Sequence, residues 1–162
     1  MKKLIYTLPI IIALTNNSFS AGDSSSEATT KVSNYTKAKN LIKAAKKYEK
    51  KGKIEKAQKR YAKAQKLLLK SNNKKPLQAD TLNYLGFTTR KLGDYKKGEE
   101  FYLQGLQIEP NHNGINEYLG ELYIVTNRMD LAKERLNVLK SCGCKEYNQL
   151  KEIIEGTKKS KY

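Results

Sequence analysis

The chain has 162 residues, of which 38% are hydrophobic and 30% charged, and 32 Lys and Arg against 16 Asp and Glu give a formal net charge of +16. This length fits one domain and is too short for a doubly wound enzyme with a second domain. The composition excludes a membrane channel, a collagen and a disulfide-stapled miniprotein. One His and two Cys leave little material for catalysis.

Residues 1–20 have the layout of a secretory signal. The start carries two lysines, residues 4–14 are mostly apolar, and Ser18 and Ser20 are the small residues before a cleavage site after Ser20. We therefore expect export to a bacterial periplasm or release from the cell. The alternative is an uncleaved anchor, although the apolar run is shorter than the roughly 20 residues that span a bilayer. We expect no stable membrane span after cleavage.

The next segments predict a leader and then a helical hairpin. Residues 21–35 are rich in Ser and Thr and are expected to be a disordered leader. Apolar residues then recur at helical spacing in residues 41–48 and again in residues 57–68, with Gly52 between the two runs. This pattern predicts a helix, a tight turn and a second helix.

The same hairpin recurs along the rest of the chain. Gly86 and Gly120 are 34 residues apart, as are Gly98 and Ala132. A fixed 34-residue helix-turn-helix period is typical of tetratricopeptide repeats. We therefore predict an all-α solenoid over residues 36–155. The expected repeats are residues 38–71, 79–112 and 113–144, followed by a capping helix over 145–155 and a flexible basic tail over 156–162.

Two kinds of residue are expected to pack the repeats. Small residues allow the two helices of one repeat to approach, and large residues fill the space between repeats. The small residues are Ala45, Gly86 and Gly120, and the large residues are Tyr61, Tyr102 and Leu136.

The motifs resemble those of one group within that repeat family. Residues 80–87 read DTLNYLGF, residues 90–95 read RKLGDY, and residues 117–123 read EYLGELY. Together they resemble a group of exported bacterial tetratricopeptide repeat proteins, in which a Cys pair is also followed by Glu-Tyr and a helix. The resemblance covers residues 79–154 and implies a periplasmic repeat protein.

The sequence contains few candidates for chemistry. Cys142 and Cys144 flank one Gly, and the alternatives are a structural disulfide, inert thiols or a redox pair. The resemblance implies a longer spacer between the two cysteines than the single Gly found here, so the three alternatives stay open. His112 is expected to cap a helix, and Glu99 and Glu100 are expected to be solvated. We find no catalytic constellation, so no enzyme activity, metal or cofactor is expected.

The concave face of the solenoid is the candidate binding site for a peptide or protein partner. In this architecture the first helix of each repeat lines a groove, and the alternative for each residue in it is plain solvent exposure. The positions expected to face the groove are Lys39, Ile42, Lys46, Glu49, Lys50, Asp80, Asn83, Phe87, Arg90, Lys91, Glu117, Glu121, Ile124 and Val125.

The positive charge is concentrated in the first repeat. Residues 31–75 hold seventeen Lys and Arg against two acids, and residues 76–162 hold thirteen against twelve. Along the first helix and into its turn, five lysines recur at spacings of three or four and would form a stripe: Lys39, Lys43, Lys46, Lys50 and Lys53. The excess indicates a surface for an acidic protein, lipid headgroups or wall polymer, whereas nucleic acid is not expected for an exported chain. The alternative is genome composition, because Lys outnumbers Arg by 28 to 4.

These observations favour an exported adaptor that binds a peptide or protein in the concave groove. The alternative function is a peripheral binder of anionic surfaces through the basic first repeat.

Overall fold

The structure, a computed structural model, describes residues 32–160, and within this range it contains seven α-helices and no strand. The helices are α1 (Asn34–Lys50), α2 (Ile54–Lys74), α3 (Ala79–Lys91), α4 (Tyr95–Ile108), α5 (Asn113–Val125), α6 (Met129–Leu139) and α7 (Lys145–Ile154).

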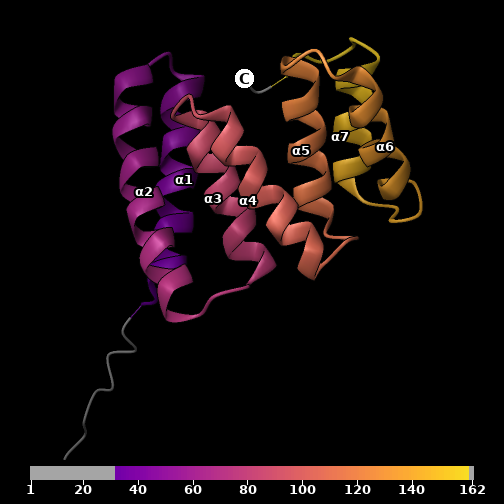
Figure 1. The fold of residues 1–162 in the computed structure, drawn as a ribbon. Helices are drawn as coiled ribbons and strands as arrows, with labels where there is room; N and C mark the ends of the chain where they lie inside the picture. The colour runs from indigo at the N-terminus through magenta and orange to yellow at the C-terminus, as the bar shows by residue number, and fades with distance from the viewer. Residues whose placement is uncertain (1–31, 161–162) are drawn as a thin grey trace, which may run out of the picture. The chain divides into compact units, whose positions relative to one another are not determined.

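The helices form three successive hairpins and a final single helix (Figure 1). Helix α1 packs on α2, α3 on α4, and α5 on α6, while α7 packs against α5 and α6. The first helices of neighbouring hairpins also touch, α1 with α3 and α3 with α5. The prediction of an all-α helical repeat solenoid is therefore confirmed.

Each hairpin turns at a residue in the left-handed region of backbone space. The three residues are Gly52 (φ 67°), Gly93 (φ 99°) and Asn127 (φ 58°). Gly and Asn adopt this conformation at a lower steric cost than other residues, and a left-handed residue is a common way to end a helix. The helix breaks expected from the sequence thus correspond to equivalent turns in all three hairpins.

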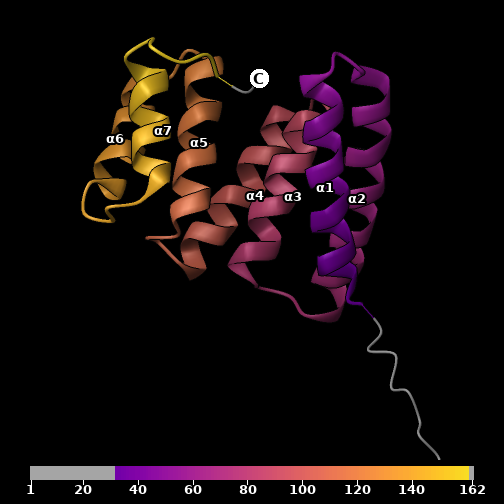
Figure 2. The ribbon, with the colours of Figure 1, turned by 180° about the vertical axis from the view of Figure 1, so that it is seen from behind.

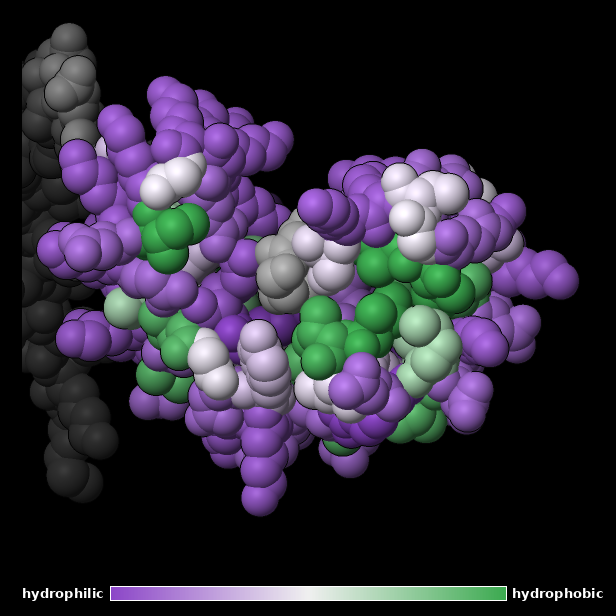
Figure 3. Space-filling model, turned by 90° about the horizontal axis from the view of Figure 1, so that it is seen from above, coloured by the Kyte–Doolittle hydropathy of each residue, from purple (hydrophilic) through white to green (hydrophobic). Residues whose placement is uncertain are grey.

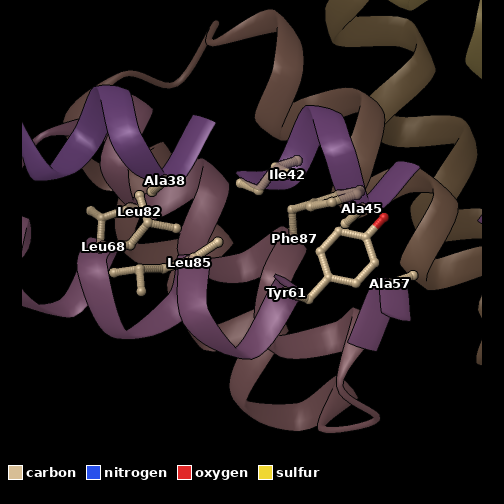
Figure 4. Close-up of a cluster of buried hydrophobic side chains, with 10 residues drawn as sticks. Ala38, Ile42, Ala45, Ala57, Tyr61, Leu68, Leu82, Leu85 and Phe87 are labelled. Carbon is tan, nitrogen blue, oxygen red and sulfur yellow. The ribbon is translucent and has the colours of Figure 1, made fainter. Parts of the chain in front are cut away.

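The first part of the core lies between α1, α2 and α3 (Figure 4). At one end the rings of Tyr61 and Phe87 meet edge to face, with 5.7 Å between their centroids. At the other end Leu68, Leu82 and Leu85 are wholly or almost wholly excluded from solvent. Each fully buried side chain of this kind stabilises the fold by roughly 1.5–3 kcal/mol.

A second buried cluster joins the next helices. Tyr102 from α4 lies with Ile115, Leu119 and Leu122 from α5 and with Ala132 from α6. The chain therefore has no separate core for each hairpin, and each apolar face is covered by the neighbouring repeat, as expected for a solenoid.

Two glycines allow close helix packing, but against different partners. A Cβ at Gly86 would lie 2.5 Å from Cε1 of Tyr102, so the α3–α4 pair requires Gly there. A Cβ at Gly120 would lie 2.5 Å from Cδ2 of Leu150, which belongs to α7. The atoms nearest to a Cβ at Gly120 thus belong to the capping helix and not to α6, the second helix of its own repeat.

One packing expectation needs correction. The sequence predicts that Leu136 fills the space between repeats, yet Leu136 is only half-buried, and Leu139 is the fully buried leucine of α6. The reason is that α7 continues the stack in place of another full hairpin, so the facing surface differs from that of the earlier repeats.

The first hairpin is longer than expected at both ends. Ser33 Oγ accepts a hydrogen bond from the Thr36 backbone N–H at 3.1 Å and caps α1, so the last two residues of the expected leader (21–35) are helical. Helix α2 continues to Lys74, three residues past the expected repeat end. The first three of the seven residues between the expected first and second repeats (72–78) are therefore helical.

The predicted signal segment over residues 1–20 and most of the predicted leader lie outside the described residues. None of the helices in residues 32–160 is long and apolar enough to cross a membrane.

Candidate functional site

The first helices of the three hairpins, α1, α3 and α5, lie in sequence across one side of the repeat array (Figure 2). Side chains from these helices meet in three layers along the helix axes. We call them the lower, middle and upper layers, beginning at the N-terminal ends of the helices.

The lower layer joins α1, α3 and the start of α5. The rings of Tyr35 and Tyr84 are 5.9 Å apart, and Nε2 of His112 lies 3.3 Å from Oδ1 of Asp80. Nδ1 of His112 accepts the backbone N–H of Ile115 at 3.1 Å and caps α5. Because Nδ1 is the acceptor, Nε2 carries the proton that points toward Asp80. Burial, reinforced by the Asp80 carboxylate, raises the pKa of Tyr35 above its ordinary value.

The middle layer consists of Lys46, Phe87 and Tyr118, one residue from each helix. Nζ of Lys46 donates a hydrogen bond to the Tyr118 hydroxyl at 3.1 Å and lies 4.4 Å from the centroid of the Phe87 ring. The Phe87 and Tyr118 rings are 5.1 Å apart. A cation held against two aromatic faces is stabilised by their quadrupoles, so this contact ties the first repeat to the third.

The upper layer contains a buried ion pair between α3 and α5. Nη2 of Arg90 lies 3.6 Å from Oε2 of Glu121, both side chains are fully excluded from solvent, and Nη1 donates to the Tyr118 carbonyl at 2.7 Å. Burial lowers the pKa of Arg90, and the carboxylates of Glu121 and Glu117 oppose this effect. A guanidinium starts from so high a pKa that Arg90 stays charged.

A second ion pair continues the upper layer toward α1. Nζ of Lys91 lies 2.8 Å from Oε1 of Glu49, and the Tyr61 hydroxyl donates to Oε2 of Glu49 at 2.8 Å. The Glu49 carboxylate therefore holds α1, α2 and α3 together, with about a quarter of its side chain still exposed.

The fourteen predicted groove residues fall into three groups by exposure. Lys39, Lys50 and Asp80 are exposed; Lys46, Glu49, Lys91, Ile124 and Val125 are half-buried; Ile42, Asn83, Phe87, Arg90, Glu117 and Glu121 are buried. The six buried residues bridge the repeats instead of offering side chains to a partner, because α1, α3 and α5 lie close enough for their side chains to meet. The contact surface is thus the rim of exposed and half-buried residues.

Apolar side chains are unevenly distributed around this site. Seen from above, hydrophobic residues gather mainly on the side formed by α5 to α7, and the side formed by α1 and α2 is mostly hydrophilic (Figure 3). The half-buried Ile124 and Val125 lie at the C-terminal end of α5.

Some interactions were not anticipated from the sequence. Arg128 donates to both carboxylate oxygens of Glu99, at 2.9 and 2.7 Å, and its guanidinium lies 4.6 Å from the Tyr123 ring centroid. These hydrogen bonds raise the pKa of Arg128. The expectation that Glu99 is merely solvated is wrong, since it links α4 to the start of α6. Tyr118 was likewise missed, although it contributes to two layers.

The cysteines lie in the turn between α6 and α7. Cys142 and Cys144 are joined by a disulfide, with Gly143 between them at a φ of 58°. The left-handed backbone of this glycine brings the two Cα atoms to 5.1 Å.

Two hollows lie on the surface, and the first of them borders the lower layer. One of about 690 Å³ lies between the start of α1, the end of α2 and the start of α3, and Tyr35, Lys74 and Asp80 line part of it. The other, of about 400 Å³, lies between α2 and α4, with Leu69 and Phe101 among its lining. Across residues 32–160 no three His, Cys, Asp or Glu side chains are grouped to hold a metal ion.

Comparison with known proteins gives limited information. No family model matches the sequence. A segment of 50 residues is 44% identical to the Sol locus transcriptional repressor of Clostridium acetobutylicum. The match covers 31% of this chain and 16% of that protein, so the chain spans only a small part of its relative.

Proposed function

We propose that the chain is an exported tetratricopeptide repeat adaptor, without enzyme activity, that binds a peptide or protein on the side formed by α1, α3 and α5. The 34-residue recurrence of Gly86 and Gly120 and the three successive hairpins support this proposal. Solenoids of this kind present one extended surface built from equivalent helices, which suits an extended or helical ligand.

The observation that carries the proposal is the middle layer. Lys46, Phe87 and Tyr118 tie three repeats together, so the exposed and half-buried rim residues around them are held in a fixed arrangement for a ligand. Preorganisation reduces the entropic cost of binding.

The rim indicates the chemistry of the partner. Lys39 and Lys50 are exposed on the α1 side, whereas Ile124 and Val125 are half-buried on the α5 side. A peptide with acidic residues at one end and apolar residues at the other would complement both sides.

The cysteine pair supports an extracytoplasmic location. Disulfides persist in oxidising compartments such as the periplasm and are rare in the cytosol. The bond between Cys142 and Cys144 is therefore in keeping with the predicted signal over residues 1–20.

Site-specific photo-crosslinking in the native host tests the proposal. A photoreactive amino acid replaces Lys39 or Asp80, which are exposed on α1 and α3, or, as matched controls, Gln104 or Lys133, which are exposed on α4 and α6. We expect a discrete adduct from the first pair and none from the second. Adducts from α4 and α6 alone would contradict the proposal, as would the absence of adducts at all four positions.

A further inference from the structure

The outward face of α2 carries a straight row of lysines. The row consists of Lys56, Lys59, Lys63, Lys66, Lys70 and Lys74, and every one of them is exposed. At 3.6 residues per turn and 1.5 Å per residue, these spacings confine the row to roughly 80° of the helix circumference over about 27 Å. The buried residues of α2 (Ala57, Tyr61, Ala64 and Leu68) occupy the opposite face.

The lysine row has no counter-charges of its own. Among the ion pairs of residues 32–160, none involves a lysine of the row. Glu55 is the single acid of α2. Like charges three or four residues apart destabilise a helix, so the row weakens the element that carries it. The stripe expected on α1 is partly engaged within the protein, since Lys46 is held by Tyr118 and Phe87 and Nζ of Lys39 lies 5.2 Å from the Tyr35 ring centroid.

The composition of this face disfavours a protein partner. Protein interfaces concentrate their binding energy in Trp, Tyr and Arg and are depleted in Lys. The exposed apolar residues of α2, Ile54 and Leu69, fall outside the arc of the row, and Arg60 is engaged with the Tyr48 ring at 4.6 Å. The lysines of the row therefore present hydrated ammonium groups on flexible side chains. Such groups suit mobile phosphates better than a rigidly placed carboxylate, which Arg would bind through two hydrogen bonds.

We propose that the lysine row docks this protein on an anionic bilayer surface, with its ammonium groups against phosphodiester headgroups and no side chain inserted among the acyl chains. Clusters of four to eight basic residues on a helix are sufficient for such adsorption. Because the row lies on the second helix of its hairpin, docking leaves α1, α3 and α5 accessible. The inference does not depend on the adaptor function.

Vesicle co-sedimentation tests the inference on the full chain. The vesicles are phosphatidylcholine with or without phosphatidylglycerol, at low and high salt. We expect binding only to vesicles with phosphatidylglycerol and release at high salt, because the screening length shortens. The triple variant Lys59→Glu, Lys63→Glu, Lys66→Glu should lose about tenfold or more of the affinity. The corresponding Gln variant should lose less, and circular dichroism verifies that both remain helical.

A matched control separates the row from net charge. The variant Lys43→Glu, Lys47→Glu, Lys51→Glu changes the charge of the same hairpin by the same amount, at exposed positions on α1 and its C-terminal cap. It should retain most of the vesicle binding. Equal losses in the two triple variants would overturn the assignment to α2. Binding to soluble polyphosphate without binding to the anionic vesicles would overturn the assignment to a bilayer.

Discussion

Arg90 and Glu121 face each other inside the protein, with 3.6 Å between Nη2 and Oε2 and no exposure of either side chain. This pair joins α3 of the second repeat to α5 of the third. Transferring two charged groups from water to the interior costs free energy. Additional hydrogen bonds offset part of this cost, and one of them runs from Nη1 of Arg90 to the Tyr118 carbonyl.

The first prediction concerns this ion pair. Replacing Arg90 by Met leaves Glu121 in a buried environment without its cation and should lower the free energy of unfolding by about 3–5 kcal/mol. The double variant Arg90→Met, Glu121→Leu removes both charges and should recover part of that loss. Urea unfolding followed by circular dichroism measures both. Additive costs in the double variant would show that the two side chains are not coupled.

Gly86 provides the second prediction. A methyl group at this position meets the Tyr102 ring, so Gly86→Ala should destabilise the protein by about 1–3 kcal/mol through overpacking. Gly86→Leu should cost more and unfold the second repeat. In the background of Tyr102→Leu, the penalty of Gly86→Ala should shrink, since the flexible leucine can move aside. An unchanged penalty in that background would place the clash elsewhere.

The third prediction is a stabilising change. The hydroxyl of Tyr102 is buried and has no hydrogen-bond partner among the described residues. An unsatisfied buried polar group costs about 1–3 kcal/mol, so Tyr102→Phe should raise the free energy of unfolding by an amount near the lower end of that range. The ring and its packing against Gly86 are retained. A lower melting temperature in the Phe variant would mean that the hydroxyl has a partner.

The sequence was sufficient to predict the helices, their pairing and the close helix packing that Gly86 allows. These features depend on local spacing, because a 3.6-residue period and a glycine recurring after 34 residues both report directly on packing. The partner of Gly120 could not be predicted in the same way. Leu150 lies on α7, which is outside the repeat and has no counterpart in the earlier hairpins.

The sequence does not predict that six of the candidate groove residues are buried. The repeat register places Arg90 on the first helix of its repeat, where a charged side chain is usually solvated, and only the packing of α5 against α3 encloses it. One feature of the sequence did indicate a buried cation, namely the two acids Glu117 and Glu121 on one face of α5. Two acids four residues apart repel each other unless a cation lies near them. The Glu99–Arg128 pair had no such signal, since its residues are 29 positions apart.

The fourth prediction concerns the disulfide. Chain-entropy stabilisation grows with the length of the closed loop, reaching about 3 kcal/mol for a 15-residue loop. The bridge between Cys142 and Cys144 encloses a single residue. Replacing both cysteines by Ser should therefore lower the free energy of unfolding by less than about 2 kcal/mol. Thermal and urea unfolding of the oxidised, reduced and double-Ser proteins measure the effect, and a larger loss would assign the bridge a role in packing α7.

The last prediction concerns His112, which caps α5 through Nδ1 and reaches Asp80 of α3 through Nε2. His112→Ala removes the acceptor for the Ile115 N–H and should lower the free energy of unfolding by about 1 kcal/mol. Asn is among the best capping residues, so His112→Asn should keep most of that stability while its shorter side chain loses the contact with Asp80.

Asp80→Asn is the matched control, because it removes the negative charge and leaves the cap intact. We expect its unfolding curve to resemble that of wild type, since an amide oxygen at position 80 can still accept from Nε2 of His112 and the Asp80 side chain is largely exposed. If His112→Asn is as unstable as His112→Ala while Asp80→Asn is also destabilised, the contribution of His112 comes from the link between α3 and α5 and not from the helix cap.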